Sequence, residues 1–165
     1  MLQFSKVYFY CLVQDTSADK CIDNITESVR SSLCVTNSEN APWLALEFSE
    51  LVIVKRVVIY NRGDHGVPGE PHYVQPQIPN FHERLKNVEV RVTKELPTSG
   101  EKMFTEGELL GTFAGPGGLG QIISVEGPTR TGRFVLVQMN NTEYLNLHEV
   151  EVFGSSGAQV KSVLL

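Results

Sequence analysis

Val52-Ile53-Val54-Lys55-Arg56-Val57-Val58-Ile59-Tyr60 is a run of mostly β-branched residues, and the tract Asn61-Arg62-Gly63-Asp64 follows it directly. β-Branched and aromatic residues favour strands, and Asn, Gly and Asp end them in turns. The stretch therefore predicts a strand that presents Arg62 and Asp64 at its end. A second arginine, Arg84, begins a later segment that we also expect to be a strand. Together these residues predict a small polar pocket on a β scaffold, which suits a polyol or an anion better than a reaction.

Five further segments have the same strand-like character. Each is short, rich in aliphatic or aromatic residues, and bounded by Gly, Pro, Asn or Ser; they are residues 43–48, 88–92, 121–125, 134–139 and 147–153. No window carries a helical period over three turns, and the strands do not alternate with helix-length segments. We therefore predict an all-β protein, a jelly-roll β-sandwich, with one domain at residues 1–154 and a flexible tail at residues 155–165.

Two connections between these segments are distinctive. Residues 63–81 hold four prolines, which disfavour regular structure and predict a long surface loop. Residues 111–120 are rich in glycine but lack the Gly-Lys-Ser/Thr ending of a phosphate-binding loop. We interpret this second connection as a flexible turn.

Composition and charge narrow the classes of function. The chain has 165 residues, 41% of them apolar, which is enough to bury one core. Its net charge is −5 and its basic residues are scattered, so nucleic acid is not an expected partner. No stretch approaches the roughly 20 consecutive apolar residues of a membrane span, so no span is expected.

Cysteine usage and the N-terminal segment bear on the compartment. The three cysteines, Cys11, Cys21 and Cys34, leave at least one thiol unpaired within the monomer, and they leave room for one bridge. Residues 7–13 lack the basic start and the small-residue cleavage site of a secretory signal. The compartment is therefore left open between an intracellular protein and an extracellular one whose targeting segment precedes this sequence.

Several motifs follow one another in a characteristic order. Besides the tract through Asp64 and the segment from Arg84 to Val88, they are Cys21-Ile22-Asp23-Asn24, Ser31-Ser32-Leu33-Cys34-Val35-Thr36-Asn37-Ser38, Ala41-Pro42-Trp43-Leu44-Ala45-Leu46-Glu47-Phe48 and Tyr144-Leu145-Asn146-Leu147-His148-Glu149-Val150-Glu151-Val152-Phe153-Gly154. In this order they resemble an F-type lectin (fucolectin) domain and, more broadly, the galactose-binding, discoidin-like jelly roll. The resemblance covers about residues 14–154. It implies a domain that binds sugar and does not catalyse.

The sugar motif of that family is a His, 26 intervening residues, an Arg, any residue, an Asp, four residues, and an Arg or Lys. Arg62 and Asp64 match the motif, and Val35 stands at the histidine position. Arg84 matches the last basic residue if the 19 residues at positions 65–83 replace the family's four. The resemblance therefore implies Val35, Arg62, Asp64 and Arg84 as the ligand-binding residues.

The chemistry of the two arginines supports a sugar site. A guanidinium is a planar fork of donors, so Arg62 and Arg84 can bracket vicinal or axial ring hydroxyls while Asp64 fixes the fork from behind. Val35 can offer only an apolar contact. The alternative is that Arg62 and Asp64 pair with each other at a strand end and bind nothing.

The resemblance also implies calcium as a cofactor. In the family the cation is held by side chains that match Asp23, Ser32 and Glu149. The other ligands are backbone carbonyls from positions that match Lys20, Ile25, Ser32 and His148. Hard cations such as calcium take 6 to 8 oxygen ligands, which such a set can provide. The alternative is an aspartate that caps a turn and a solvated glutamate on a strand.

Two classes of function emerge from the sequence. The first is a lectin-like domain that recognises fucose- or galactose-type sugars on a glycan or glycoprotein. The second is a protein-interaction or structural module that has lost sugar binding and uses residues 63–81 as its contact surface. We do not expect an enzyme, because neither a nucleophile arrangement nor a spaced carboxylate pair is recognisable.

Overall fold

The computed structural model describes residues 1–3, 6–9, 17–26, 33–63, 81–96 and 105–156. Within these ranges the chain is almost wholly β-strand, which confirms the all-β prediction. Ser32, Asp64 and nearly all of the predicted loop at residues 63–81 lie outside the described residues. Within the described residues, neither short helix has the length and apolarity needed to cross a bilayer.

Nine strands and two short 3₁₀ helices make up the described chain. In chain order they are β1 (Lys6–Phe9), η1 (Ala18–Cys21), β2 (Cys34–Val35), β3 (Glu39–Asn40), β4 (Trp43–Asn61), η3 (Phe81–Arg84), β5 (Val88–Thr93), β6 (Glu108–Phe113), β7 (Ile122–Met139), β8 (Thr142–Glu143) and β9 (Asn146–Ser156). Neighbouring strands in the main sheet follow the order β2-β9-β4-β7-β5-β6, with β1 also paired to β4. β3 and β8 form a separate two-stranded ribbon. All of these pairings are antiparallel.

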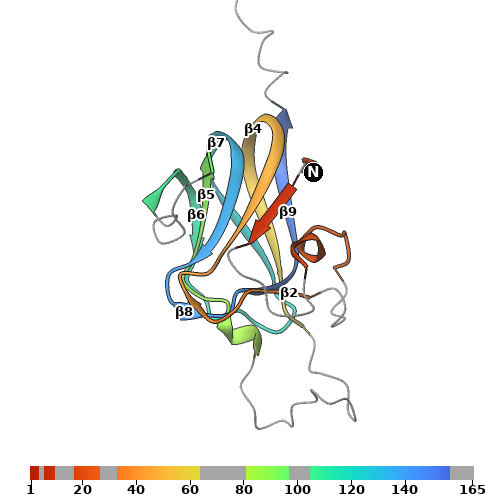
Figure 1. The fold of residues 1–165 in the computed structure, drawn as a ribbon, viewed down its shortest axis with the longest axis vertical. Coiled ribbons are helices and arrows are strands. Elements are labelled where there is room, and N and C mark those ends of the chain that lie inside the picture. Colours follow the sequence, from red (N-terminus) through yellow and green to blue (C-terminus); the bar gives the residue numbers. More distant parts are fainter. Residues whose placement is uncertain (4–5, 10–16, 27–32, 64–80, 97–104, 157–165) are drawn as a thin grey trace, which may run out of the picture.

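The long strands β4 and β7 fold this sheet into a sandwich. The two strands expected at residues 43–48 and 52–60 are halves of β4, and those expected at 121–125 and 134–139 both fall on β7. The pairing register of β4 with β7 shifts between Glu47 and Val52 and again between Val54 and Arg56, and such irregularities bend a strand. Figure 1 shows both strands arching over one end of the molecule, so that each contributes to both layers.

The core lies between the two layers. Leu44 and Leu46 from the first half of β4 belong to the same buried cluster as Val57 and Ile59 from the second half. Strand β5 shows the alternation that a half-buried strand needs, because every second residue of Val88–Thr93 is buried. Trp43 is also buried, but it packs in a smaller cluster with Ala45 and Leu136.

Three boundaries differ from the sequence predictions. Arg84 ends η3 and does not start a strand, because β5 begins only at Val88. Residues 111–113 of the predicted glycine-rich turn belong to β6. The last strand continues to Ser156, two residues beyond the expected domain end, because Ser155 and Ser156 pair with Ile53 and Val52.

A disulfide joins Cys21 at the end of η1 to Cys34 at the start of β2. This is the one bridge for which the cysteine count left room. The bond holds the turn that follows η1 against the edge of the main sheet, because β2 is paired to β9.

Candidate functional site

The first candidate site is a cluster of side chains that we call the arginine–aromatic cluster: Arg62, Phe81, Arg84, Glu143 and Tyr144. Arg62 directly follows β4, and Phe81 and Arg84 are the first and last residues of η3. Glu143 ends β8, and Tyr144 lies between β8 and β9. The fold thus brings Arg62 and Arg84 together although 21 residues separate them in the sequence.

Both guanidinium groups lie against the same aromatic ring. The Cζ atoms of Arg62 and Arg84 are 4.5 Å and 4.6 Å from the centroid of the Phe81 ring. The Cζ atom of Arg84 is also 4.6 Å from the centroid of the Tyr144 ring. These distances are within the range of cation–π attraction, which orients a planar guanidinium as well as holding it. Arg84 is therefore fixed by two rings before any ligand arrives.

Glu143 completes the support of Arg84. Its Oε1 lies 3.4 Å from Nε of Arg84 and accepts a hydrogen bond of 3.0 Å from the backbone N–H of Tyr144. Among the residues that the structure describes, the terminal amino groups of Arg84 have no hydrogen-bond partner. With 23% of its side chain exposed, Arg84 can present these donors to a ligand.

A buried asparagine holds the base of the cluster together. The Nδ2 atom of Asn61 donates to the carbonyl of His82 in η3 at 3.0 Å and to the carbonyl of Gly118 at 2.8 Å. Gly120 donates its N–H to the carbonyl of Arg62, and Gly117 donates to that of Leu85. The segment from Gly117 to Gly120, predicted as a flexible turn, therefore positions both arginine-bearing elements.

Val35 lies two strands away from Arg62. It pairs with Asn146 on β9, and Asn61 pairs with the next residue, Leu147. With strands about 4.8 Å apart, Val35 and Arg62 flank the start of β9 at a distance on the order of 10 Å. Val35 is only 9% exposed. Asn146 beside it is fully buried, and neither polar atom of its side chain has a hydrogen-bond partner within the described part of the chain.

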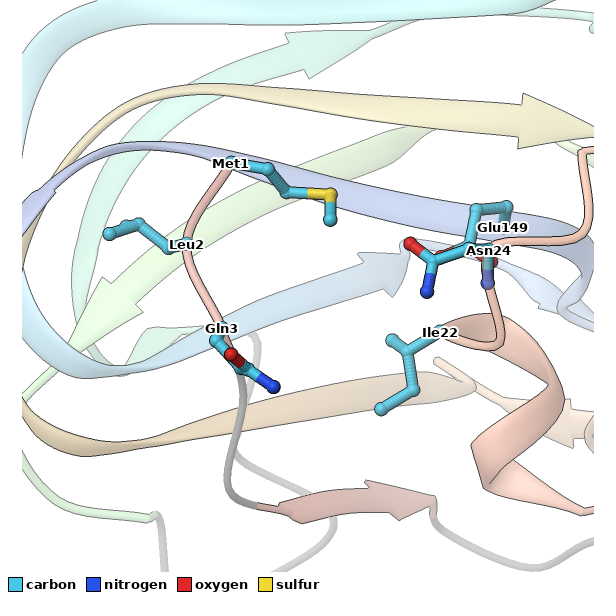
Figure 2. Close-up of a pocket in the computed structure, with 6 residues that line it drawn as sticks. All are labelled: Met1, Leu2, Gln3, Ile22, Asn24 and Glu149. Carbon is cyan, nitrogen blue, oxygen red and sulfur yellow. The ribbon is translucent and has the colours of Figure 1, made fainter.

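The second candidate site surrounds Glu149. The turn after η1 meets β9 here, because the backbone N–H of Asn24 donates to Glu149 Oε2 at 2.8 Å. Asp23 accepts a hydrogen bond of 2.9 Å from the N–H of Ile25, so its carboxylate also shapes this turn. Figure 2 shows Glu149 and Asn24 on one side of a cavity of about 280 Å³ whose other side is the segment Met1, Leu2 and Gln3.

The carboxylate of Glu149 is buried and lies near other negative charges. Glu149 is only 2% exposed, and this burial raises the pKa of its carboxyl group to about 8. The negative charge of Asp23 raises the pKa further, while the N–H groups of Asn24 and Val150 oppose the rise. Among the described residues no Lys, Arg or His forms an ion pair with Asp23 or Glu149.

These observations fit a hard cation at this position. A buried negative charge without a partner is unfavourable, and a bound cation would relieve both the burial cost and the repulsion by Asp23. The described residues contain no group of three or more His, Cys, Asp or Glu side chains placed to hold a metal, so carbonyl oxygens would have to complete the shell. Lys20 lies in η1 before Asp23, Ile25 lies two residues after Asp23, and His148 precedes Glu149 on β9.

Of the predicted residues, the fold brings together Arg62 and Arg84 in one place, and Asp23 and Glu149 in another. Asp64 and Ser32 lie outside the described residues. The sequence analysis missed Glu143 and the anchoring role of Asn61. No spacing rule points to either residue, because both act through backbone groups or neighbours that only the tertiary structure supplies.

Comparison with known proteins identifies the fold. No family model matches the sequence, and neither does any curated protein. Among solved structures the chain is similar to a fucolectin from the serum of striped bass, Morone saxatilis, with a TM-score of 0.72 and 24% identity over 92% of this chain and 47% of that one. It is similar to the lectin domain of lectinolysin complexed with Lewis b antigen, with a TM-score of 0.67 and 22% identity over 92% of this chain and 93% of that one. It is also similar to a fucose-binding module from Streptococcus pneumoniae, with a TM-score of 0.64 and 18% identity over 92% and 93%.

These likenesses confirm the predicted jelly-roll fold. The chain spans about half the length of the striped bass lectin and nearly all of the two other domains.

Proposed function

We propose that this chain is a non-catalytic carbohydrate-binding module that holds a fucose- or galactose-type sugar at the arginine–aromatic cluster. The observation that carries the proposal is the state of Arg84, whose guanidinium is fixed by two rings and Glu143 while its terminal donors have no partner among the described residues. Pre-oriented donors bind a ligand without a further ordering cost. The structural neighbours named as lectins and fucose-binding modules support sugar as that ligand.

The chemistry of the cluster matches a sugar ring. The two guanidinium groups can donate to neighbouring hydroxyls, and the rings of Phe81 and Tyr144 offer apolar faces to C–H groups. A partner glycan or glycoprotein would meet this cluster where η3 and the β3–β8 ribbon lie close together. Asp64, which matches the family motif, would add its carboxylate behind Arg62.

Calorimetric titration with methyl α-L-fucopyranoside and methyl β-D-galactopyranoside tests this function. Arg62→Ala and Arg84→Ala should each weaken binding by about tenfold or more, because each removes charged donors that uncharged neighbours cannot replace. Arg56→Ala is the matched control, since Arg56 also stacks on a ring, that of Phe153 at 4.2 Å, outside the cluster. A wild-type protein that binds neither glycoside, nor any glycan on an array, would contradict the proposal.

That negative outcome would favour the second class of function, a protein-interaction module of the same fold. Val35 supports this alternative, because an apolar and nearly buried side chain stands where the lectin motif has a histidine. In this alternative, the predicted loop at residues 63–81 is the contact surface for a protein partner. Deleting that loop would then abolish capture of a protein partner, while the arginine substitutions would leave it intact.

We also propose a structural calcium ion in the second site. Asp23 and Glu149 would supply its carboxylates, Ser32 its hydroxyl, and Lys20, Ile25, Ser32 and His148 their backbone carbonyls. Bound calcium would supply positive charge that neutralises Glu149 and fixes the turn after η1 on β9. The support is the buried carboxylate of Glu149, which has no cationic partner among the described residues.

A further inference from the structure

The proposed sugar site needs an acceptor that the two arginines cannot supply. A ring hydroxyl both donates and accepts a hydrogen bond, whereas a guanidinium only donates. In the family motif an imidazole can serve as acceptor, but the side chain of Val35 has no polar atom. A hydroxyl held by Arg62 and Arg84 alone would keep an unsatisfied proton in a partly desolvated site, which is unfavourable.

Glu143 offers the missing acceptor. Its Oε1 is engaged by the N–H of Tyr144 and by Nε of Arg84. Its Oε2 has no hydrogen-bond partner among the described residues, and 25% of its side chain is exposed. Oε1 therefore fixes the carboxylate in place, and Oε2 can accept a hydrogen bond beside the terminal donors of Arg84.

The charges around the cluster indicate a neutral ligand. Glu143 lies directly opposite Glu39 in the β3–β8 ribbon, where paired residues have Cβ atoms about 5 Å apart. The carboxylate of Glu39 therefore adds a second negative charge beside that of Glu143, which faces Arg84. Oε2 of Glu39 is buried without a hydrogen-bond partner among the described residues. Contacts within the ribbon therefore do not offset all of its negative charge.

We propose that Glu143 is a specificity-determining ligand contact, whose Oε2 accepts the proton of the ring hydroxyl to which Arg84 donates. This inference rests on the proposed sugar-binding function and deepens it. It assigns neutral sugars as the ligand class and predicts that acidic sugars are rejected, because a sugar carboxylate would meet the carboxylate of Glu143. The cluster without Glu143 would be a cationic site open to uronates.

Fluorinated sugars separate the role of acceptor from that of mere support for Arg84. Fluorine in place of a hydroxyl can accept from Arg84 but cannot donate to Glu143. The experiment titrates wild type, Glu143→Ala and Glu143→Gln with the two methyl glycosides, with each of their monodeoxyfluoro analogues, and with methyl galacturonate anion. Glu89→Ala is the control, because the Glu89 side chain is similarly exposed, at 20% against 25% for Glu143, and is ion-paired to Arg91 outside the cluster.

We expect one fluoro analogue to bind the wild type and Glu89→Ala about tenfold more weakly than the parent glycoside. In Glu143→Ala that ratio should fall to less than about threefold, and galacturonate should gain affinity in both Glu143 variants. Glu143→Gln can keep the hydrogen bond from Tyr144 N–H, so it reports on the lost charge even if Glu143→Ala is poorly folded.

Equal fluoro penalties in wild type and the Glu143 variants would overturn the inference and leave Glu143 as a positioning residue for Arg84. Unchanged rejection of galacturonate by Glu143→Gln would overturn the assigned ligand class. In both cases the wild type still binds the parent glycosides, so the proposed function stands. If the wild type binds no glycoside, the proposed function fails and the inference falls with it.

Discussion

Arg84 shows how one residue can be fixed for recognition by one side chain near it in the sequence, Phe81, and by two distant ones, Glu143 and Tyr144. Its guanidinium is held by the planes of Phe81 and Tyr144, which come from different parts of the chain. Such stacking depends on a flat, delocalised cation. The shape of the group is therefore as important here as its charge.

Arg84→Lys tests this dependence on shape. Lysine keeps the charge but has neither the planar fork nor the pre-oriented donors, so we expect glycoside affinity to fall by about tenfold. The melting temperature should change little, because Arg84 is partly exposed. Calorimetry gives the affinity and circular dichroism the melting curve. Arg56→Lys, with the same stacking at Phe153, should leave affinity unchanged, and equal affinity of Arg84→Lys and wild type would show that charge alone suffices.

Val35→His restores the residue that the lectin motif has at this position. The new imidazole would lie beside Asn146, whose amide atoms have no partner among the described residues and can orient it. We expect glycoside affinity to rise by about tenfold if the imidazole reaches a ring hydroxyl. Val35→Leu is the control for volume. A histidine variant that binds no better than the leucine variant would place position 35 outside the ligand's reach.

Glu149 should make stability depend on pH in a direction opposite to that of most carboxylates. Its folded-state pKa of about 8 lies above its ordinary value of 4.5, so the folded protein binds more protons between these limits. Without calcium, the stability from protonated Glu149 is full below about pH 4.5 and is lost as the pH rises to about 8. Glu149→Gln should remove this part of the dependence in melting curves recorded with a chelator.

Calcium should reverse the loss at high pH. Because the cation competes with the proton for Glu149, added millimolar calcium should raise the melting temperature more at about pH 8.5 than at about pH 6. Asp23→Asn should reduce the calcium response, whereas Asp19→Asn, in η1 just before this turn and outside the proposed ligand set, should not. A calcium response that is absent in the wild type at both pH values would remove the cation from this site.

At the scale of elements, the sequence predicted strands well and their boundaries less well. The runs of β-branched residues identified both halves of β4, both halves of β7, β5 and β9, because half-buried strands need such residues. The bend within β4 was not predictable, since residues 49–51 are exposed and lie between Glu47 and Val52, where the register with β7 shifts. Strand β6 was missed because its residues were read together with the glycines that follow.

Asn61 links these elements to the site, and Asn61→Leu tests that link. The substitution keeps the branching at Cγ but removes the donor to the carbonyls of His82 and Gly118, at a cost of roughly 1–3 kcal/mol in unfolding free energy. Because η3 loses its anchor beside Arg62, glycoside affinity should also fall by several-fold.

Val152→Ala is the control for stability alone. Val152 is fully buried in the middle of β9 and outside the cluster, so its truncation should cost a comparable amount, roughly 1–3 kcal/mol, without loss of affinity. Chemical denaturation and calorimetry on both variants separate the two effects. An Asn61→Leu protein that is destabilised but binds with full affinity would show that η3 is held in place by other contacts.

At the scale of the molecule, both candidate sites lie where separate segments meet around β9. The resemblance to a lectin domain predicted Arg62, Arg84, Asp23 and Glu149 as site residues from the order of its motifs along the chain. It could not identify Glu143 or Asn61, whose roles follow from the β3–β8 ribbon and from the approach of the segment Gly117 to Gly120 to η3. What the sequence could not supply is the packing of irregular segments, which no periodicity encodes.

The Cys21–Cys34 disulfide ties the proposed calcium turn to the strand that carries Val35, and its removal should separate the two sites. Opening a bridge between residues 13 positions apart should lower the unfolding free energy by about 3 kcal/mol in the chain-entropy account. In the double variant Cys21→Ser, Cys34→Ser, the turn after η1 loses its covalent hold, so the rise in melting temperature with calcium should shrink. Glycoside affinity should stay within about threefold of wild type, because β4, η3 and the β3–β8 ribbon hold the arginine–aromatic cluster without the bridge.

Cys11→Ser, which leaves the bridge intact, serves as the control for both readouts. If the double variant lost sugar binding while still folded, the two sites would be one cooperative unit and the independence argued here would be wrong.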